Sequence, residues 1–222
     1  MKYDSFRYYY PPRADGKPMP AALLPGWEER GYWASIKKNG TCNLIDITPD
    51  REIICKTRHP AIEKGDHRAW KPDNRTVRPF LNLPGTGWYK FLGELMNGKV
   101  KGIRHINYIH DILVCDGEPL VGMTFAERQK ILAELFPNTT APDPKDAELY
   151  GIGYTMIDEH TWLAKNYLPS TNYFNLFRSL TAPADEGLVL KKPTATLAIC
   201  AREDSNTSWQ TKVRRPTTTN HF

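Results

Sequence analysis

The sequence predicts an α+β domain of largely antiparallel sheets flanked by helices. Short apolar segments rich in strand-forming residues outnumber helical segments, and many of them are separated by turn residues rather than by crossover helices. The chain shows neither an internal repeat nor a regular strand–helix alternation. Its 222 residues suit one catalytic-sized unit better than a string of small modules.

Three parts are expected along the chain. Residues 1–30 are predicted to form an extended arm, because prolines interrupt both helices and strand ladders there. These prolines are Pro11, Pro12, Pro18, Pro20 and Pro25. Residues 31–216 form the predicted catalytic domain and 217–222 a tail. Within the domain, 59–87 is rich in Pro, Gly and charge, which indicates a long surface excursion.

Residue patterns within the domain predict its strands and helices. A strand over 31–36 runs into Lys37, and a hairpin follows it. The clearest helix begins after Thr124, which forms a capping box with Glu127. Strands are expected at 31–36, 42–47, 52–56, 110–115, 149–157, 187–190 and 196–200, helices at 125–136 and 171–180, and a helical or strand-like segment at 88–96.

Composition and charge exclude several classes of protein. Lys and Arg outnumber Asp and Glu by 30 to 25, and the net charge of +5 fits a polyanion-binding surface without requiring one. No apolar run approaches the roughly 20 residues needed to cross a bilayer, and the N-terminus lacks a secretory signal, so a cytoplasmic protein without membrane contact is expected. The four cysteines lie far apart, which favours buried reduced thiols over a zinc site or disulfides.

The string Lys37-Lys38-Asn39-Gly40 is the first candidate for chemistry. It places a lysine two residues before a turn dipeptide, at the end of one expected strand and before the next. Alone, the string is far more typical of two solvated lysines beside a hairpin turn than of a catalytic lysine. Its significance therefore depends on the strings that follow it along the chain.

Four further strings follow in order. They are Leu92-Gly93-Glu94-Leu95, the run HDILVCDGE that begins at His110, the run DEGLVLK that ends at Lys191, and the run WQTKVR that ends at Arg214. Together with Lys37 they resemble the nucleotidyltransferase motifs of ATP-dependent DNA ligases, a superfamily shared with RNA ligases and mRNA capping enzymes. The resemblance extends over residues 31–215, approximately. Within the superfamily, these strings are most similar to those of the DNA ligases. This resemblance implies an ATP-grasp-like nucleotidyltransferase (adenylation) domain.

The resemblance implies that Lys37 is the nucleophile that forms lysyl-AMP. A lysine amine attacks phosphorus only as the neutral base, so neighbouring cations or burial must lower its pKa from the ordinary value near 10.4. Lys38, Lys191 and Lys212 are candidates for those cations. Charge that develops on the α-phosphate requires fixed positive groups, for which Lys191, Lys212 and Arg214 with Mg²⁺ are expected.

The remaining roles concern the ribose, the base and the metal. By resemblance, Arg58 contacts ribose or phosphate, Glu94 holds the ribose hydroxyls, and His110 stacks on adenine. Glu186 helps to bind Mg²⁺, and Asn39 belongs to the same nucleotide site. Each has a structural alternative: the glutamates as solvated strand-end carboxylates, and His110 as a core or edge histidine.

Two departures from the family pattern stand in the chain. Asn39 occupies a position where ligases usually carry aspartate, and Cys42 occupies one where they carry arginine. Asn39 can still form the turn and hydrogen bonds, but it is a weaker metal ligand than a carboxylate and cannot act as a base. No OB domain is expected after Arg214, so the arm, the 59–87 excursion or a partner supplying an OB-type clamp would have to hold the nucleic acid.

These expectations combine into one hypothesis. An ATP-dependent polynucleotide ligase would use ATP and Mg²⁺ to adenylate Lys37 and then seal 5′-phosphate and 3′-hydroxyl ends, with nicked duplex DNA as the expected substrate. An RNA ligase with the same chemistry stays open, because lysine and arginine contacts to the backbone look alike for both polymers. A guanylyltransferase of the capping type and a catalytically weak relative that binds nucleic acid also stay open.

Overall fold

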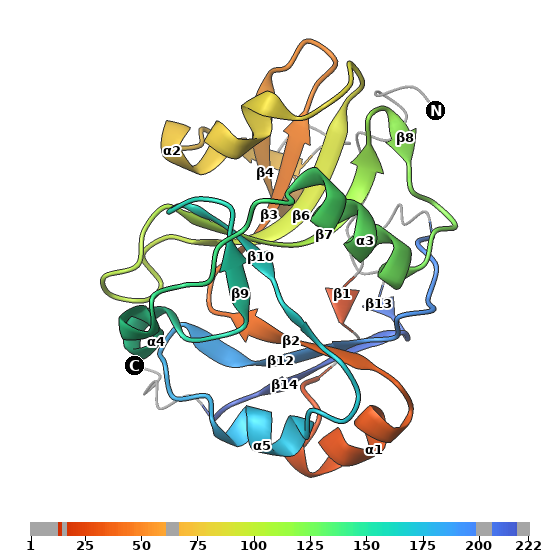
Figure 1. Ribbon diagram of the computed structural model, residues 1–222, viewed down its shortest axis with the longest axis vertical. Coiled ribbons are helices and arrows are strands. Elements are labelled where there is room, and N and C mark those ends of the chain that lie inside the picture. Colours follow the sequence, from red (N-terminus) through yellow and green to blue (C-terminus); the bar gives the residue numbers. More distant parts are fainter. Residues whose placement is uncertain (1–12, 15–16, 61–66, 199–205, 217–222) are drawn as a thin grey trace.

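The structure is a computed structural model and describes residues 13–14, 17–60, 67–198 and 206–216. Two sheets dominate it and confirm the predicted α+β class (Figure 1). The larger has the strand order β5-β4-β3-β6-β7-β10-β9, with β8 paired to β7, and the smaller the order β11-β2-β12-β14. All pairings within these two sheets are antiparallel except that of β10 with β7. The described residues contain no closed barrel.

The bounds of the elements are as follows. The larger sheet consists of β3 (Thr41–Ile47), β4 (Ile53–Pro60), β5 (His67–Trp70), β6 (Tyr89–Met96), β7 (Ile106–Cys115), β8 (Glu118–Pro119), β9 (Tyr154–Met156) and β10 (Thr161–Ala164). The smaller consists of β2 (Trp33–Lys38), β11 (Asn166–Tyr167), β12 (Asp185–Lys191) and β14 (Gln210–Arg214), and β1 (Arg13–Ala14) pairs separately with β13 (Asn206–Thr207). The helices are α1 (Leu24–Glu29), α2 (Asn74–Val77), α3 (Phe125–Leu135), α4 (Ala147–Tyr150) and α5 (Tyr173–Arg178), with short 3₁₀ turns at Ala21–Leu23, Arg78–Asn82 and Pro144–Asp146.

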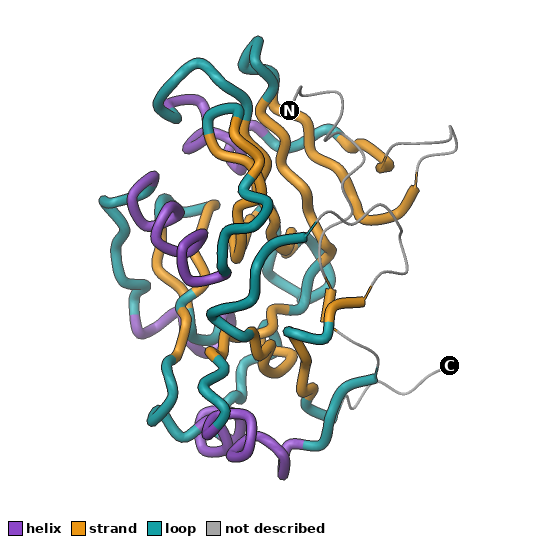
Figure 2. The backbone as a smooth tube through the Cα atoms, turned by 90° about the vertical axis from the view of Figure 1, so that its right-hand side faces the viewer, coloured by secondary structure: helices purple, strands orange, loops and turns teal. Residues whose placement is uncertain are grey.

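Each sheet buries one face against helices. Leu132 of α3 and Phe80 of the 3₁₀ turn belong to the cluster that covers the larger sheet. Leu24 of α1 and Tyr173 of α5 pack with Leu188 on the outer face of the smaller sheet. Strands run through the middle of the molecule and helices lie at its margins (Figure 2). The opposite face of the smaller sheet, which we call the inner face, is therefore not covered by α1 and α5.

Local sequence rules explain the elements that were predicted correctly. The capping box of Thr124 and Glu127 is present at the start of α3, and the hairpin of β3 and β4 follows Lys37 as expected. The segment at 88–96 is the strand β6. The second predicted helix is α5, whose N-cap is Asn172.

Three element predictions were wrong. Residues 1–30 are not extended throughout, because Pro25 lies in the first turn of α1, where a missing N–H is tolerated. The strand expected at 149–157 is reduced to β9, since α4 ends at Gly151, which adopts a positive φ. In the 59–87 excursion, β5, α2 and the buried Phe80 and Leu83 add regular structure, while 61–66 lies outside the described residues.

Two smaller expectations concern Thr196 and the cysteines. Thr196 forms an isolated bridge with Thr124, and no strand continues through 198, the last described residue of that segment. Cys42, Cys55 and Cys115 are free thiols, but only Cys55 is buried as predicted, and Cys42 and Cys115 are partly exposed; Cys200 lies outside the described part of the chain. Among the described helices, none has the length and apolar content required to span a bilayer.

Replacement of Gly187 by alanine should strain the centre of the smaller sheet. Gly187 has φ +151°, and an added Cβ would overlap the carbonyl oxygen of Val213 on β14. We expect Gly187→Ala to lower the free energy of unfolding by about 1–3 kcal/mol from backbone strain, with the overlap adding to this loss. Chemical denaturation monitored by circular dichroism would measure it.

Gly26→Ala is the matched control, because an added Cβ at Gly26 meets nothing within 4 Å. Alanine is also a better helix former than glycine inside α1. The control should be neutral or slightly stabilised. Equal effects of the two substitutions would contradict the proposed strain at Gly187.

Candidate active site

Lys37 lies at the junction of the two sheets. It is the penultimate residue of β2 in the smaller sheet, and β3 of the larger sheet begins only four positions later at Thr41. Asn39 and Gly40 make the whole connection, and the N–H of Asn39 donates to the carbonyl of Ala184 at 2.9 Å. The Asn-Gly pair therefore joins two sheets instead of closing a hairpin between paired strands.

A β-bulge brings Glu186 to Lys37. Along β12, Asp185 pairs with Lys38 and Gly187 with Lys37, so Glu186 is the extra residue between two consecutive pairs. Bulges of this kind redirect a side chain. The Lys37 ammonium donates to Glu186 Oε2, and Arg214 Nε lies 3.6 Å from Glu186 Oε1. The two side chains of the Lys37–Glu186 pair keep 17% and 19% of their surface exposed, so the pair remains accessible to a ligand.

Glu94 approaches the same junction from the larger sheet. It pairs across strands with Cys42, and the N–H of Gly40 donates a hydrogen bond to its carboxylate. Burial raises the pKa of Glu94 to about 7, although the charges of Lys37 and Lys99 oppose this shift. The site thus holds a carboxyl group that titrates near neutral pH.

Lys99 is a residue of this site that the sequence patterns did not identify. It lies in the connection between β6 and β7, and its ammonium donates to the carbonyl of Gly40 while its charge acts on Glu94. The basic stretch 99–104 was visible in the sequence. Nothing in that stretch indicated that the connection folds back onto the Asn-Gly junction.

The inner face of the smaller sheet carries the other candidates in three rows across β2, β12 and β14. The rows are Lys37–Gly187–Arg214, Ser35–Val189–Lys212 and Trp33–Lys191–Gln210. Side chains at alternate positions of a strand share a face, so all three rows point the same way. Lys212 and Arg214 consequently lie on the face that carries Lys37.

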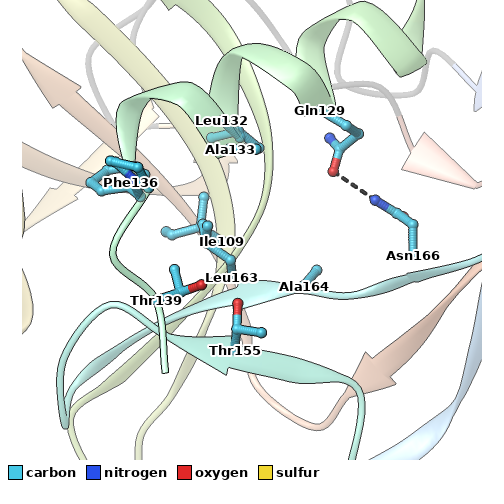
Figure 3. A pocket seen from close by; sticks show the side chains of 11 residues that line it. Ile109, Gln129, Leu132, Ala133, Phe136, Thr139, Thr155, Leu163, Ala164 and Asn166 are labelled. Atoms are coloured by element: carbon cyan, nitrogen blue, oxygen red, sulfur yellow. Dashed lines mark hydrogen bonds between the residues drawn. The ribbon is translucent and has the colours of Figure 1, made fainter. Parts of the chain in front are cut away.

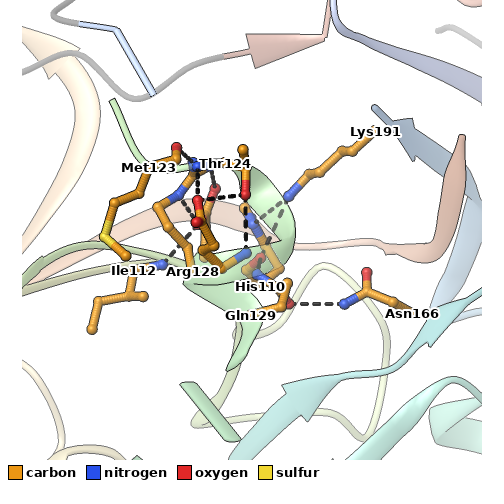
Figure 4. A network of polar contacts seen from close by, with 10 residues as sticks. His110, Ile112, Met123, Thr124, Arg128, Gln129, Asn166 and Lys191 are labelled. Atoms are coloured by element: carbon orange, nitrogen blue, oxygen red, sulfur yellow. Dashed lines mark hydrogen bonds and ion pairs between the residues drawn. The ribbon is translucent and has the colours of Figure 1, made fainter. Parts of the chain in front are cut away.

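His110 and Lys191 meet at the other end of this face (Figure 4). Lys191 Nζ lies 3.5 Å from His110 Nδ1 and 3.4 Å from the carbonyl oxygen of His110. Burial, and then the charge of Lys191, lower the pKa of His110 to about 3, so its imidazole is neutral at physiological pH. Burial also lowers the pKa of Lys191 to about 8, and its ammonium stands over the ring of Phe125 at 4.5 Å.

Two buried ion pairs support this face. Arg128 of α3 donates to both oxygens of Asp111, the residue after His110, each at 2.9 Å. This bidentate pair fixes the strand that carries His110. Lys38 forms the second pair with Asp185 at 2.6 Å, on the face of β2 opposite to Lys37. The expectation that Lys38 acts as a cation beside the nucleophile was therefore wrong, because successive residues of a strand point to opposite faces.

Arg58 lies on β4 beside the junction. Asn43 pairs with Thr57, which places Arg58 next to Cys42. Burial raises the pKa of the Cys42 thiol to about 12, and the charge of the Arg58 guanidinium opposes this rise. Glu94, which pairs with Cys42 from the other side, also acts on this thiol. All nine sequence-predicted site residues therefore lie along the junction or on the inner face beside it.

Glu186 and Glu94 are the carboxylates that could hold a metal. The described residues contain no cluster of three or more potential ligands from His, Cys, Asp and Glu. Mg²⁺ commonly binds through one or two carboxylates together with substrate phosphates, so such a cluster is not required. The donor set next to Lys37 fits this mode of binding.

Comparison with known proteins places this arrangement in a class. The ligase domain of M. tuberculosis LigD superposes with a TM-score of 0.60 at 13% identity, covering 96% of this chain and 61% of that chain. Mycobacterial DNA ligase D complexed with ATP and MES gives 0.59 at 12% identity, covering 96% and 62%. A Lig E DNA ligase gives 0.53 at 15% identity, covering 92% and 69%. The fold is thus that of a ligase nucleotidyltransferase domain.

Sequence comparison agrees with the fold. DNA ligase 4 of Yarrowia lipolytica is 23% identical over an alignment 210 residues long that covers 89% of this chain and 20% of that protein. No protein-family model matches the chain. In sequence the chain is similar to an ATP-dependent DNA ligase, and in fold it is similar to the nucleotidyltransferase domain of such ligases, so the predicted resemblance is confirmed. The chain spans about a fifth of the length of this curated relative.

Replacement of Glu94 by glutamine should change how stability depends on pH. Because the folded-state pKa of Glu94 is about 7 and the ordinary value is 4.5, the unfolded chain loses this proton first as pH rises. The wild-type protein therefore loses stability between those two values, and the loss is complete above pH 7. Glu94→Gln, which is neutral throughout, should match wild type near pH 4 and exceed its stability by roughly 1–3 kcal/mol at pH 8.

Denaturation at several pH values would measure this difference, with the exposed Glu148→Gln as control. The control should follow the wild-type curve. A Glu94→Gln variant that follows the wild-type curve at every pH would show that burial of this carboxyl group is not costly.

Proposed function

We propose that the protein is an ATP-dependent polynucleotide ligase that acts through lysyl-AMP at Lys37, with nicked DNA as its substrate. The observation that carries the proposal is the Lys37–Glu186 pair at the sheet junction. A lysine held by a carboxylate is both oriented and provided with a proton acceptor. The residues near the pair that could bind phosphate or ribose support the same transfer of AMP to the lysine.

In the first step, Lys37 Nζ attacks the α-phosphorus of ATP. Glu186 takes a proton from the ammonium, because its Oε2 already accepts the hydrogen bond from Lys37. A P–N bond forms between Lys37 Nζ and the α-phosphorus, the bond from that phosphorus to the bridging oxygen breaks, and pyrophosphate leaves with the electron pair. The second proton of the nitrogen passes to the departing pyrophosphate or to water. Lys212 and Arg214 stabilise the charge on the α-phosphate from the rows beside Lys37. Mg²⁺ held by Glu186 and the phosphates supplies further positive charge when bound.

The nucleoside lies along the inner face of the smaller sheet. Glu94 accepts hydrogen bonds from the ribose hydroxyls near the junction, and Arg58 contacts ribose or phosphate there. The neutral imidazole of His110 stacks on adenine at the other end, beside Lys191. The carboxylates Glu94 and Glu186 and the cation Arg214 thus lie near the junction. The base end carries the neutral His110 and one cation, Lys191, which was expected from the sequence to lie at the α-phosphate.

The later steps transfer AMP to a 5′-phosphate and seal the strand. The 3′-hydroxyl attacks the adenylated 5′-phosphate, a new phosphodiester forms, and AMP leaves. Lys101 and Arg104, both exposed in the connection that also carries Lys99, are available for backbone phosphates near the junction. An RNA ligase would share these groups, and Asn39 in place of the usual aspartate motivates the alternative of a catalytically weak nucleic-acid-binding relative.

Loss of Lys37 should abolish the covalent adduct. Incubation with α-labelled ATP and Mg²⁺ should produce an acid-stable labelled protein, and Lys37→Ala should reduce the label at least about 10³-fold because alanine carries no amine to form the P–N bond at this position. Lys130→Ala, at an exposed lysine of α3, should be labelled like wild type. Labelling of Lys37→Ala at the wild-type level would disprove the assignment of the nucleophile.

Sealing assays separate the possible polymers. At matched, low salt, the protein should join nicked duplex DNA faster than single-stranded RNA, and the rate should fall as salt rises because phosphate contacts release counterions. The weak-relative alternative predicts nucleic-acid binding without joined product. Faster joining of single-stranded RNA than of nicked DNA would contradict the proposed substrate and would indicate an RNA ligase.

A further inference from the structure

Two side-chain amides form a directed chain that ends beside His110. Asn166 Nδ2 of β11 donates to Gln129 Oε1 of α3 at 2.8 Å, and Gln129 Nε2 donates to the carbonyl oxygen of His110 at 3.2 Å. Three separate elements thus meet through two polar side chains (Figures 3 and 4). The mechanism above uses neither amide.

The direction of this chain is fixed by its last member. A backbone carbonyl only accepts hydrogen bonds, so Gln129 must present its NH₂ group to His110 and its oxygen to Asn166. Asn166 must then donate its NH₂ group to Gln129. A flip of either amide would oppose two donors or two acceptors. The side chain of Asn166 therefore cannot flip. Its Oδ1 atom, which only accepts hydrogen bonds, stays on the side away from Gln129.

Asn166 belongs to the face that carries Lys37. It pairs with Ser35, which pairs in turn with Val189, and Lys37 lies two residues beyond Ser35 on the same face. Two residues span roughly 6–7 Å along a strand. The amide chain therefore adjoins both the predicted base-stacking residue and the strand of the nucleophile.

The space behind the amides is uncharged. A cavity of about 290 Å³ is bounded by Gln129 and Asn166 on one side (Figure 3). Apolar side chains such as Ile109 and Leu132 line it together with Thr139, and none of its lining residues is ionisable. Such a lining suits the uncharged edge of a base and disfavours a phosphate.

We propose that Gln129 and Asn166 select adenine, with Asn166 Oδ1 accepting a hydrogen bond from the 6-amino group of the base and opposing the 6-oxo group of guanine. This inference rests on the proposed function, because it places the base at His110. Discrimination follows from the fixed direction of the two amide hydrogen bonds, because a 6-oxo group would set one acceptor against another. Gln129 acts as a positioning residue, since it only orients Asn166.

The test compares nucleotides that differ only at the base. Wild-type protein should form adduct with ATP about 10-fold more efficiently than with purine riboside triphosphate, which lacks the 6-amino group, and should reject GTP more strongly. Asn166→Ala should lose about 10-fold with ATP and nothing with purine riboside triphosphate, so the ratio of the two falls to about one. Gln129→Leu should accept GTP better than wild type, because Asn166 can then turn its NH₂ group to the base.

Thr139→Ala is the matched control, because Thr139 lines the same cavity without joining the amide chain. It should keep the wild-type preference. Equal losses of Asn166→Ala with ATP and with purine riboside triphosphate would overturn the inference. An unchanged rejection of GTP by Gln129→Leu would do the same.

Equilibrium binding of the same three nucleotides distinguishes this inference from the proposed function. Preferential binding of ATP that disappears in Asn166→Ala, without any adduct in wild type, would support base selection and refute nucleotide transfer. Adduct formation that shows no dependence on Asn166 would support nucleotide transfer and refute base selection. The two proposals therefore fail by different results.

Discussion

The close approach of Gly40 to the larger sheet is the constraint on which the site depends. A Cβ at this position would lie 2.6 Å from the carbonyl oxygen of Leu95 and 2.5 Å from Cγ of Glu94. Only glycine leaves room for β2 and β3 to belong to different sheets and still be joined by two residues. The same contact brings Glu94 to the end of the strand that carries Lys37. The glycine of the K-x-N-G string therefore determines where two sheets, and two site residues, meet.

The site holds several ionisable side chains whose burial reduces the stability of the folded protein. Burial raises the pKa of Glu94 and lowers those of His110 and Lys191, so each of these groups resists its charged form. Such groups reduce stability and are typical of functional sites. The apolar clusters on the outer faces of both sheets, and the bidentate Asp111–Arg128 pair, stabilise the frame that holds them. The loss of stability that these groups cause is thus confined to the inner face of the smaller sheet.

Local rules predicted much of the fold and the composition of the site, but not its geometry. The capping box of α3 and the hairpin after Lys37 depend on neighbouring residues, and both were predicted. The pairing of Lys37 with Glu186 depends on a bulge between strands about 150 positions apart in the chain, and no local pattern encodes it. Lys99 and Asn166 were missed for the same reason, because each acts through contacts made only in the folded chain.

The smaller sheet explains why the nucleophile and the base-binding groups can work together. Gly187 and Lys191 lie four residues apart on β12, which corresponds to roughly 13 Å along the strand. Over that length the inner face changes from the Lys37–Glu186–Arg214 charges to the neutral imidazole of His110, which lies beside the Lys191 ammonium and the two amides. For a nucleotide bound as proposed, binding of the base at one end fixes the α-phosphate at the other. Since displacements near 1 Å can reduce rates 10²-fold, a single sheet is a better support for both ends than two loops would be.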